Sequence, residues 1–202
     1  MRLNQEPEVL LMGHPLLFQE QPQVAVGEIT SDDFQHNLEI LKQKQLCTLG
    51  VGLAAPQIGW PARVFSLGIS EINRSRYPQA PDIPFAFWIN PQIINFSSNT
   101  CWTWEGCLSV PGMRAWIERP ESITVVGYNE QGERQQRDLS GFTARVMQHE
   151  LDHLDGKLFP MRVEDKSLII PNQSIEHQEE WAKDWPTGSA RKTIRGQISD
   201  TR

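Results

Sequence analysis

Apolar side chains recur at close to helical spacing between residues 30 and 49. They stand at Phe34, Leu38, Leu41, Leu46 and Leu49. Thr30 and Asp33 are placed as a capping box, and Gly50 follows the last apolar position as a stop signal. The pattern predicts an N-terminal amphipathic helix over residues 30–49 that packs one face against the rest of the protein.

A strand-rich segment follows this helix. Short runs rich in Val, Ile and aromatic residues are separated by Pro, Asn and Gly, and they occupy residues 62–69, 85–89, 91–96 and 122–129. Such runs are typical of β-strands. Residues 129–132 then separate the last run from a polar segment, which predicts a hairpin turn between two strands.

A second helical pattern covers residues 141–156, and Ser140 is placed to cap its start. At about 100° per residue, one narrow arc of this helix holds Phe142, Val146, His149 and His153. Further apolar positions widen the arc: Met147, Leu151 and Leu154. The other side is polar: Arg145, Gln148, Asp152 and Asp155. The chain is therefore expected to have an α+β fold, in which short mixed or antiparallel strands pack around this central helix.

The composition favours a protein that acts on a small molecule or a peptide. A chain of 202 residues, 39% of them hydrophobic, is long enough to bury a core. Its formal charge of -6 argues against a DNA partner, because binding to phosphate backbones needs clustered Lys and Arg. Three cysteines are too few for a disulfide framework, which favours the cytoplasm. The N-terminal residues show neither a signal peptide nor a membrane span.

We expect a domain boundary near residue 165. Residues 1–165 carry the helical and strand patterns and form the expected catalytic domain, whereas residues 166–202 form a polar C-terminal extension with little periodicity. The last part of this extension, residues 186–202, is locally basic on an acidic protein.

The second helix carries a candidate metal centre. His149 and His153 lie four residues apart on its buried face, so two neutral imidazoles can bind one ion. Glu150 stands at the edge of the same face, where it can handle the proton of a water molecule. The same His-Glu-x-x-His pattern occurs in peptidases, so the third ligand decides the chemistry.

Several residues compete for that third position. In the metzincin pattern the last histidine would fall on Phe159, which cannot bind a metal. A zinc peptidase with a downstream carboxylate remains open through Glu164, Glu176 or Glu179. Cys107 would instead complete a three-ligand site with one open coordination position, as catalysis requires.

Two upstream segments add to this picture. In the alternating residues 101–106, Cys101 is expected to be a small buried residue of a strand rather than a fourth ligand. The glycines and alanines of residues 50–59 allow the backbone to approach a ligand closely. Within them, Gln57 offers an amide that can donate to a carbonyl oxygen.

Taken together, these segments resemble the peptide deformylase family. Its motifs GxGxAAxQ, EGCLS and HExDH stand here in the same order, at residues 50–57, 105–109 and 149–153. The resemblance spans roughly residues 5–165. It implies an enzyme that removes the formyl group from the N-terminal formylmethionine of newly synthesised proteins and releases formate.

The resemblance also implies roles for individual residues. One divalent ion would be held by Cys107, His149 and His153. That ion would be Fe2+ in the cell, with Ni2+, Co2+ or Zn2+ possible in purified protein. Glu150 would transfer protons, while the Gln57 amide and the Leu108 backbone N–H would donate to the oxygen that becomes negative.

The N-formylmethionyl peptide is expected to bind as an added strand. Gly52 and Gly106 offer backbone groups for this pairing. Val51 and Val146 are candidates for the wall of an apolar pocket that takes the methionine side chain, and Arg114 could face the peptide backbone.

Two other classes of function stay open at this stage: an HExxH peptidase, and a metal-stabilised binding module without catalysis. Such a module would be expected to have lost Glu150 or Gln57, and both are present. Nascent chains emerge from an RNA-rich machine, so the basic residues 186–202 could contact the ribosome, but a solvated terminus is favoured over this contact.

Overall fold

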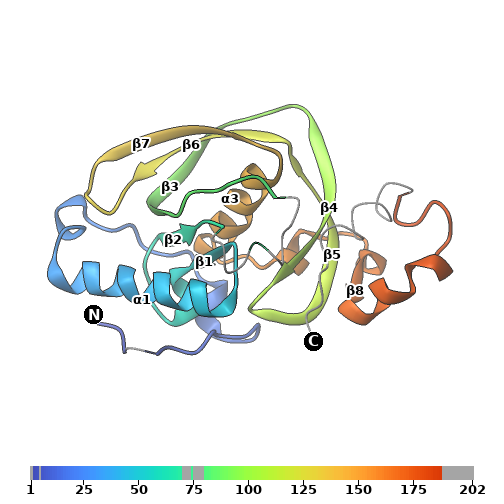
Figure 1. Cartoon of the computed structure of the whole chain (residues 1–202), viewed down its shortest axis with the longest axis horizontal. Helices are drawn as coiled ribbons and strands as arrows, with labels where there is room; N and C mark the ends of the chain where they lie inside the picture. Colours follow the sequence, from blue (N-terminus) through green and yellow to red (C-terminus); the bar gives the residue numbers. More distant parts are fainter. Residues whose placement is uncertain (1, 5, 70–73, 75–79, 188–202) are drawn as a thin grey trace.

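The computed structural model of the protein describes residues 2–4, 6–69, 74 and 80–187 (Figure 1). Within these residues, one antiparallel sheet has the order β1-β2-β3-β6-β7, formed by β1 (Gly52–Ala54), β2 (Val64–Leu67), β3 (Ala86–Phe96), β6 (Ser122–Tyr128) and β7 (Arg134–Ser140). A second antiparallel sheet has the order β4-β5-β8, formed by β4 (Thr100–Cys107), β5 (Val110–Pro120) and β8 (Ile169–Pro171).

The α-helices of this part are α1 (Asp32–Thr48) and α3 (Gly141–Leu154). Short 3-10 segments connect the larger elements: η1 (Pro15–Phe18), η2 (Val26–Glu28), η3 (Ala55–Ile58), η4 (Phe159–Arg162), η5 (Lys166–Leu168) and η6 (Asn172–Glu180). The expected α+β fold is confirmed, with α3 in the middle of the molecule (Figure 1).

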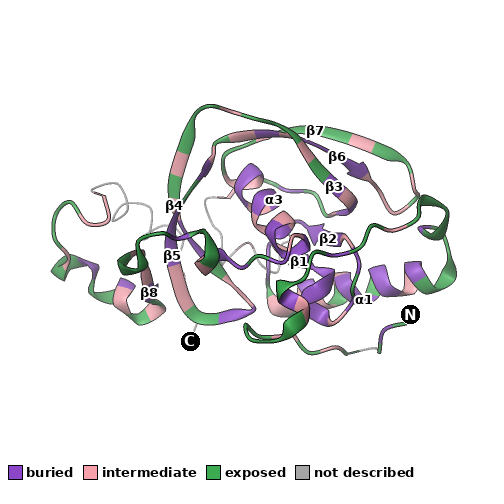
Figure 2. Ribbon diagram, turned by 180° about the vertical axis from the view of Figure 1, so that it is seen from behind, coloured by how far each residue is buried: buried purple, intermediate pink, exposed green. Residues whose placement is uncertain are grey.

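The two helices cover opposite faces of the five-stranded sheet. Successive residues of a strand point to opposite faces, and here the two faces bury separate clusters. Strand β2 is buried along its whole length (Figure 2). Val64 packs with Leu41 of α1, while its neighbour Phe65 packs with Met147 of α3. The sheet therefore fixes α3, the helix with the candidate ligands, from one side.

The expected N-terminal helix is present with different ends. Its N-cap is Ser31, whose Oγ accepts from the Phe34 N–H at 3.4 Å, so the prediction of a cap at Thr30 was wrong. The helix ends at Thr48, and its C-cap, Leu49, adopts the left-handed conformation with φ 57°. Gly50, the expected stop, therefore does not supply the left-handed residue at the end of this helix.

The two runs at residues 85–89 and 91–96 form one strand, β3, rather than two. Asn90 joins them with φ 50°, and its side chain exchanges two hydrogen bonds with the backbone of Val24, at 2.8 and 2.7 Å. The Asn-Pro pair looked like a break in sequence because both residues are common in turns. Here they produce an irregularity within a continuing strand.

Helix α3 agrees with the predicted range, but the expected cap was wrong. The Ser140 side chain makes no capping hydrogen bond. The polar side of the helix is buried, since Arg145, Gln148 and Asp152 are only 5%, 5% and 4% exposed. Strands β4 and β5 cover that side and supply its hydrogen-bond partners.

The segment after residue 165 is not a detached tail where the structure describes it. β8 pairs with β5, and the ring centroids of Trp181 and Trp185 lie 5.9 and 6.3 Å from that of Trp104 on β4. The domain boundary at residue 165 stays a prediction. Most of the basic segment 186–202 lies outside the described residues. In the part described, no helix has the length and apolar character needed to cross a membrane.

The end of α3 is bonded to the N-terminal segment and to Arg63. The Gln21 N–H donates to the Leu154 carbonyl at 2.8 Å, and Arg63 pairs with Asp155 at 2.8 Å. Gly156 makes this approach possible, because its φ is 69° and a Cβ there would lie 2.8 Å from the carbonyl carbons of Phe18 and Gln19.

We therefore expect Gly156→Ala to lower the free energy of unfolding more than Gly132→Ala. Gly132 has φ 78°, but a Cβ there would meet nothing closer than 3.9 Å, so alanine costs only the left-handed backbone, about 1–2 kcal/mol. Urea denaturation compares the two variants. Equal losses would contradict the close approach at Gly156.

Candidate metal centre

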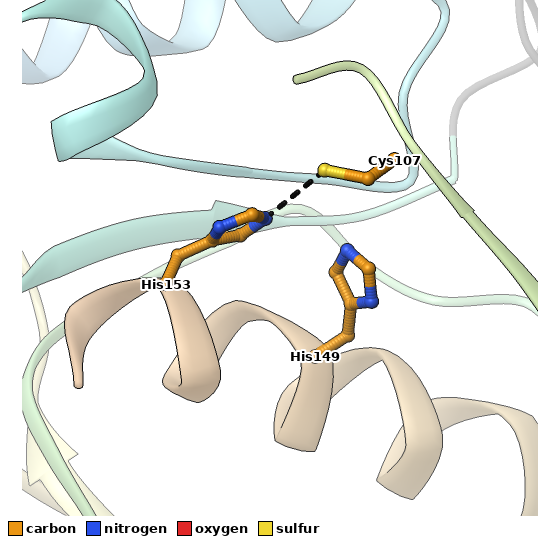
Figure 3. A group of neighbouring side chains, drawn as sticks. All are labelled: Cys107, His149 and His153. Atoms are coloured by element: carbon orange, nitrogen blue, oxygen red, sulfur yellow. Dashed lines mark hydrogen bonds between the residues drawn. The ribbon is translucent and has the colours of Figure 1, made fainter. Parts of the chain in front are cut away.

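The structure brings the three predicted ligands together. Cys107 is the last residue of β4, and His149 and His153 project from successive turns of α3 (Figure 3). Their ligand atoms all lie within 4.8 Å of one another, and the Cys107 Sγ is 3.3 Å from the His153 Nε2. One thiolate and two imidazoles at this spacing fit a single divalent ion.

Among the described residues, the downstream carboxylates do not join this group. Glu164, Glu176 and Glu179 were the ligands expected for a zinc peptidase, and none of them lies with His149 and His153. Glu179 instead belongs to a separate exposed group with His177 and Glu180.

A carboxylate fixes the orientation of His149. Its Nδ1 lies 3.0 Å from Glu105 Oε2, and because a carboxylate only accepts, Nδ1 carries the proton and Nε2 keeps its lone pair for an ion. Burial lowers the pKa of His149, but the Cys107 sulfur and Glu105 outweigh it and hold that pKa well above its ordinary value. The raised pKa favours a second proton on Nε2, and an ion that binds at Nε2 must displace that proton.

His153 is buried and is suited to ligation in its neutral form. Burial, together with the nearby His149, holds the pKa of His153 well below its ordinary value. Its Nε2 faces the Cys107 sulfur, and its Nδ1 is a buried nitrogen without a hydrogen-bond partner among the described residues. Neutral imidazole is the form that binds metals.

Glu150 is a buried carboxyl group beside the ligands. It is 4% exposed, and burial raises its pKa to about 7. Its Oε2 has no hydrogen-bond partner within the described part of the chain. A carboxyl group with a pKa near neutrality can both accept and return a proton.

Gly52 makes the room that Glu150 occupies. A Cβ at Gly52 would lie 2.4 Å from Glu150 Oε1, far inside van der Waals contact. The first residue of β1 therefore has a steric role that the sequence reasoning did not identify, beyond the backbone pairing expected of it.

The Gln57 amide is held with its nitrogen toward the site. Its Oε1 accepts from the Ala54 N–H at 2.8 Å, which leaves Nε2 to donate to Ser109 Oγ at 3.1 Å and to the Cys107 sulfur at 3.6 Å. Leu108 follows Cys107 in the turn between β4 and β5. Both predicted donors thus belong to segments that adjoin the sulfur ligand.

The predicted peptide-binding residues lie on the elements around the ligands. Val51 and Val146 contribute to the same apolar cluster. Gly106 stands opposite Arg114 in the β4–β5 register, and β1 and β4 are the end strands of their sheets among the described residues. Their roles toward a substrate stay predictions.

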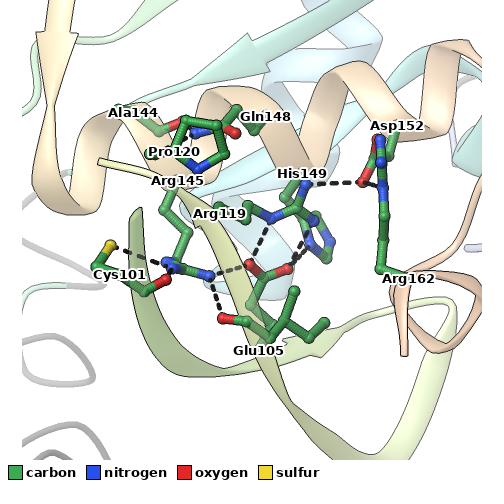
Figure 4. Close-up of polar contacts among 11 residues, drawn as sticks. Cys101, Glu105, Arg119, Pro120, Ala144, Arg145, Gln148, His149, Asp152 and Arg162 are labelled. Atoms are coloured by element: carbon green, nitrogen blue, oxygen red, sulfur yellow. Dashed lines mark hydrogen bonds and ion pairs between the residues drawn. The ribbon is translucent and has the colours of Figure 1, made fainter. Parts of the chain in front are cut away.

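Sequence reasoning missed a buried ionic network behind His149 (Figure 4). Arg119 donates twice to Glu105, at 2.6 and 2.9 Å, and once to Asp152 at 2.9 Å, while Arg145 donates to Glu105 at 2.6 Å. Burial raises the pKa of Glu105, but Arg119 and His149 outweigh it and hold that pKa well below its ordinary value. The carboxylate therefore stays ionised.

Cys101 was expected to be a small buried residue of a strand, and the expected burial was wrong. It is half-buried, and its carbonyl and Sγ accept from Arg145 at 2.6 and 3.3 Å. The alternating pattern correctly placed it in a strand, but a period-2 pattern shows nothing of a charged partner that comes from a distant helix.

Comparisons with known proteins agree with this geometry. Residues 7–168 match the sequence family described as polypeptide deformylase. The peptide deformylase of Leptospira biflexa is 37% identical over 169 residues, which cover 84% of this chain and 94% of that protein. Peptide deformylase 1 of Nitrosomonas europaea is 39% identical over 173 residues, which cover 83% of this chain and 96% of that protein.

Solved structures extend the likeness to the fold. A class I type b peptide deformylase from Acinetobacter baumannii, crystallised with Met-Ala-Ser bound, matches with a TM-score of 0.73 and 35% identity over 81% of this chain and 100% of that chain. The peptide deformylase of Thermotoga maritima matches with a TM-score of 0.69 and 31% identity over 79% and 98%.

The protein is expected to bind one Co2+ per chain with a sulfur-to-cobalt charge-transfer band. Cys107→Ala should remove that band and most of the affinity, because a thiolate ligand is lost. Cys47→Ala, which changes an exposed cysteine of α1, is the control and should keep both. Anaerobic titration followed by absorption spectroscopy measures this, and an unchanged band in Cys107→Ala would exclude the sulfur ligand.

Proposed function

This chain belongs to the peptide deformylase family and is a metal-dependent hydrolase that removes the N-terminal formyl group of nascent peptides, and we propose that Cys107, His149 and His153 hold its ion. The observation that supports this assignment most strongly is the convergence of one sulfur and two imidazoles beside the buried Glu150. An ion held by these three residues would polarise the formyl carbonyl and lower the pKa of a bound water molecule.

Glu150 is the proton carrier of the reaction. Hydrolysis adds one water across the formyl C–N bond, so formate and a free amine leave, and one proton must move from the water to the amine nitrogen. Burial has raised the Glu150 pKa to about 7, which suits a group that accepts this proton and then returns it.

Gln57 and Leu108 stabilise the oxygen that becomes negative. The Gln57 Nε2 points toward Cys107, and the Leu108 backbone N–H follows that residue in the turn. In other hydrolases one such hydrogen-bond donor stabilises the transition state by about 3 kcal/mol. The hydrogen bond from the Ala54 N–H to Gln57 Oε1 supports this role, because it prevents the amide from turning its oxygen to the site.

The formylated peptide binds as a strand between the edges of β1 and β4. Gly52 and Gly106 stand on these edges, and Arg114 lies opposite Gly106 in the register. Val51 and Val146 wall the pocket for the methionine side chain. The Acinetobacter baumannii relative was crystallised with Met-Ala-Ser, a peptide that begins with methionine, which supports this class of ligand.

The ion in the cell is Fe2+. Cysteine and histidine bind Fe2+, Zn2+, Co2+ and Ni2+ alike, so the assignment rests on the family resemblance rather than on the ligand set. The enzyme works in the cytoplasm, where nascent peptides and reduced cysteines occur together. Residues 1–165 form the catalytic domain, and the basic residues 186–202 contact the ribosome.

Glu150→Gln should lower kcat about 10²- to 10⁴-fold and leave the metal content unchanged, because the amide cannot accept a proton. Formate release from formyl-Met-Ala-Ser measures kcat, and elemental analysis measures the ion. Casein serves as the control substrate. Cleavage of casein by the wild type, without release of formate from the peptide, would overturn the assignment in favour of a peptidase.

Gly52→Ala should lower kcat/KM for the same peptide, because the added methyl group would displace the Glu150 carboxylate. Gly27→Ala is the control, since a Cβ there would meet no atom within 4 Å. Circular dichroism establishes that both variants are folded. A folded Gly52→Ala enzyme with the wild-type kcat/KM would show that the contact with Glu150 has no part in catalysis.

Removal of residues 186–202 should weaken co-sedimentation with ribosomes at low salt, because Lys and Arg contacts to RNA depend on charge. Added salt should weaken the binding of the full chain in the same way. Equal co-sedimentation of the full and shortened chains would exclude the ribosome contact.

A further inference from the structure

Arg145 lies behind the metal centre and has no part in the proposed chemistry. It stands on α3, one turn before His149, and is 5% exposed. A buried guanidinium is costly unless its donors are satisfied and its charge is paired. All of its hydrogen-bond acceptors that the structure gives come from the β4–β5 hairpin. These hydrogen bonds attach α3 to that hairpin.

Those acceptors join both strands of the hairpin to the helix. Nη1 donates to Glu105 Oε1 at 2.6 Å and to the Ile117 carbonyl on β5 at 3.1 Å. Nη2 donates to the Cys101 carbonyl on β4 at 2.6 Å (Figure 4). A planar guanidinium can make these bonds at once because its donors have a fixed geometry.

Glu105 connects Arg145 to two of the proposed ligands, Cys107 and His149. It stands two residues before Cys107 on β4, and its Oε2 accepts from His149 at 3.0 Å. Its Oε1 takes donors from both Arg119 and Arg145, each at 2.6 Å. Arg119 comes from β5, so Arg145 is the cation that fixes this carboxylate from the helix itself.

We propose that Arg145 is a positioning residue for the metal centre, which sets the separation between the strand that carries Cys107 and the helix turn that carries His149. The inference rests on the proposed ligand set of Cys107, His149 and His153. Partners that orient metal ligands typically change metal affinity 10- to 100-fold when they are removed. Loss of Arg145 leaves Glu105 with Arg119 and His149 but releases the helix from Cys101 and Ile117.

Gln148 offers a matched control on the same helix. It is also 5% exposed, and its Nε2 also ties α3 to β5, through the Pro120 carbonyl at 3.0 Å. Its other hydrogen bond goes to Ala144 of the helix at 3.1 Å. Gln148→Met thus removes a tie between helix and strand without removing a donor from Glu105.

The test compares Arg145→Met, Arg145→Lys and Gln148→Met as full chains loaded with Co2+ without oxygen. The readouts are the cobalt absorption spectrum, the rate at which a chelator removes Co2+, and Tm. We expect Arg145→Met to lose Co2+ roughly 10- to 100-fold faster with a shifted spectrum. Arg145→Lys, which keeps the charge but not the planar fork, should fall between this variant and the wild type. Gln148→Met should lower Tm and keep the wild-type spectrum.

Two results would overturn the inference. One is a wild-type spectrum and release rate in Arg145→Met, and the other is the same spectral shift in Gln148→Met, which would mean that any loss of helix docking disturbs the ion. If Arg145→Met does not fold, Arg145→Lys makes the same comparison. A wild-type protein without a sulfur-to-cobalt band would instead refute the ligand set itself, and with it this inference.

Discussion

The candidate metal centre depends on one buried carboxylate, Glu105, and on the cations around it. Cys107 and His149 come from distant parts of the chain, and neither β4 nor α3 alone brings them together. Glu105 is near Cys107 in sequence and hydrogen-bonded to His149 in space, so a single side chain restrains both. A buried carboxylate without partners would cost several kcal/mol, which Arg119 and Arg145 offset.

The rest of the fold serves this arrangement from the other side. The five-stranded sheet supports α3 through Phe65 and Met147, and Gly52 on its edge leaves space for Glu150. At the far end of the helix, Gly156 lets the N-terminal segment close against it. The proposed ligands, the proposed proton carrier and the proposed oxygen donors are therefore held by separate elements that meet at one helix.

The sequence predicted the candidate site residues that belong to one local pattern. The spacing of His149 and His153 placed both imidazoles on one helix face. The small residues around Gln57 indicated a backbone that approaches a ligand closely, and the turn around Cys107 indicated the third metal ligand. It was uninformative where chemistry depends on distant partners. The sequence placed Arg145 and Asp152 on the polar side of the helix, but nothing in a helical pattern shows that a hairpin covers that side. Likewise the aromatic packing of Trp181 on Trp104 joins segments that no periodicity connects.

The central claim is that one sulfur and two imidazole nitrogens bind a single ion and leave a position open. X-ray absorption spectroscopy at the metal edge of anaerobically purified protein tests it most directly. We expect a first shell with one sulfur, two histidine nitrogens and at least one light atom that exchanges with added ligand. A shell without sulfur, or one filled by four protein atoms, would contradict the account.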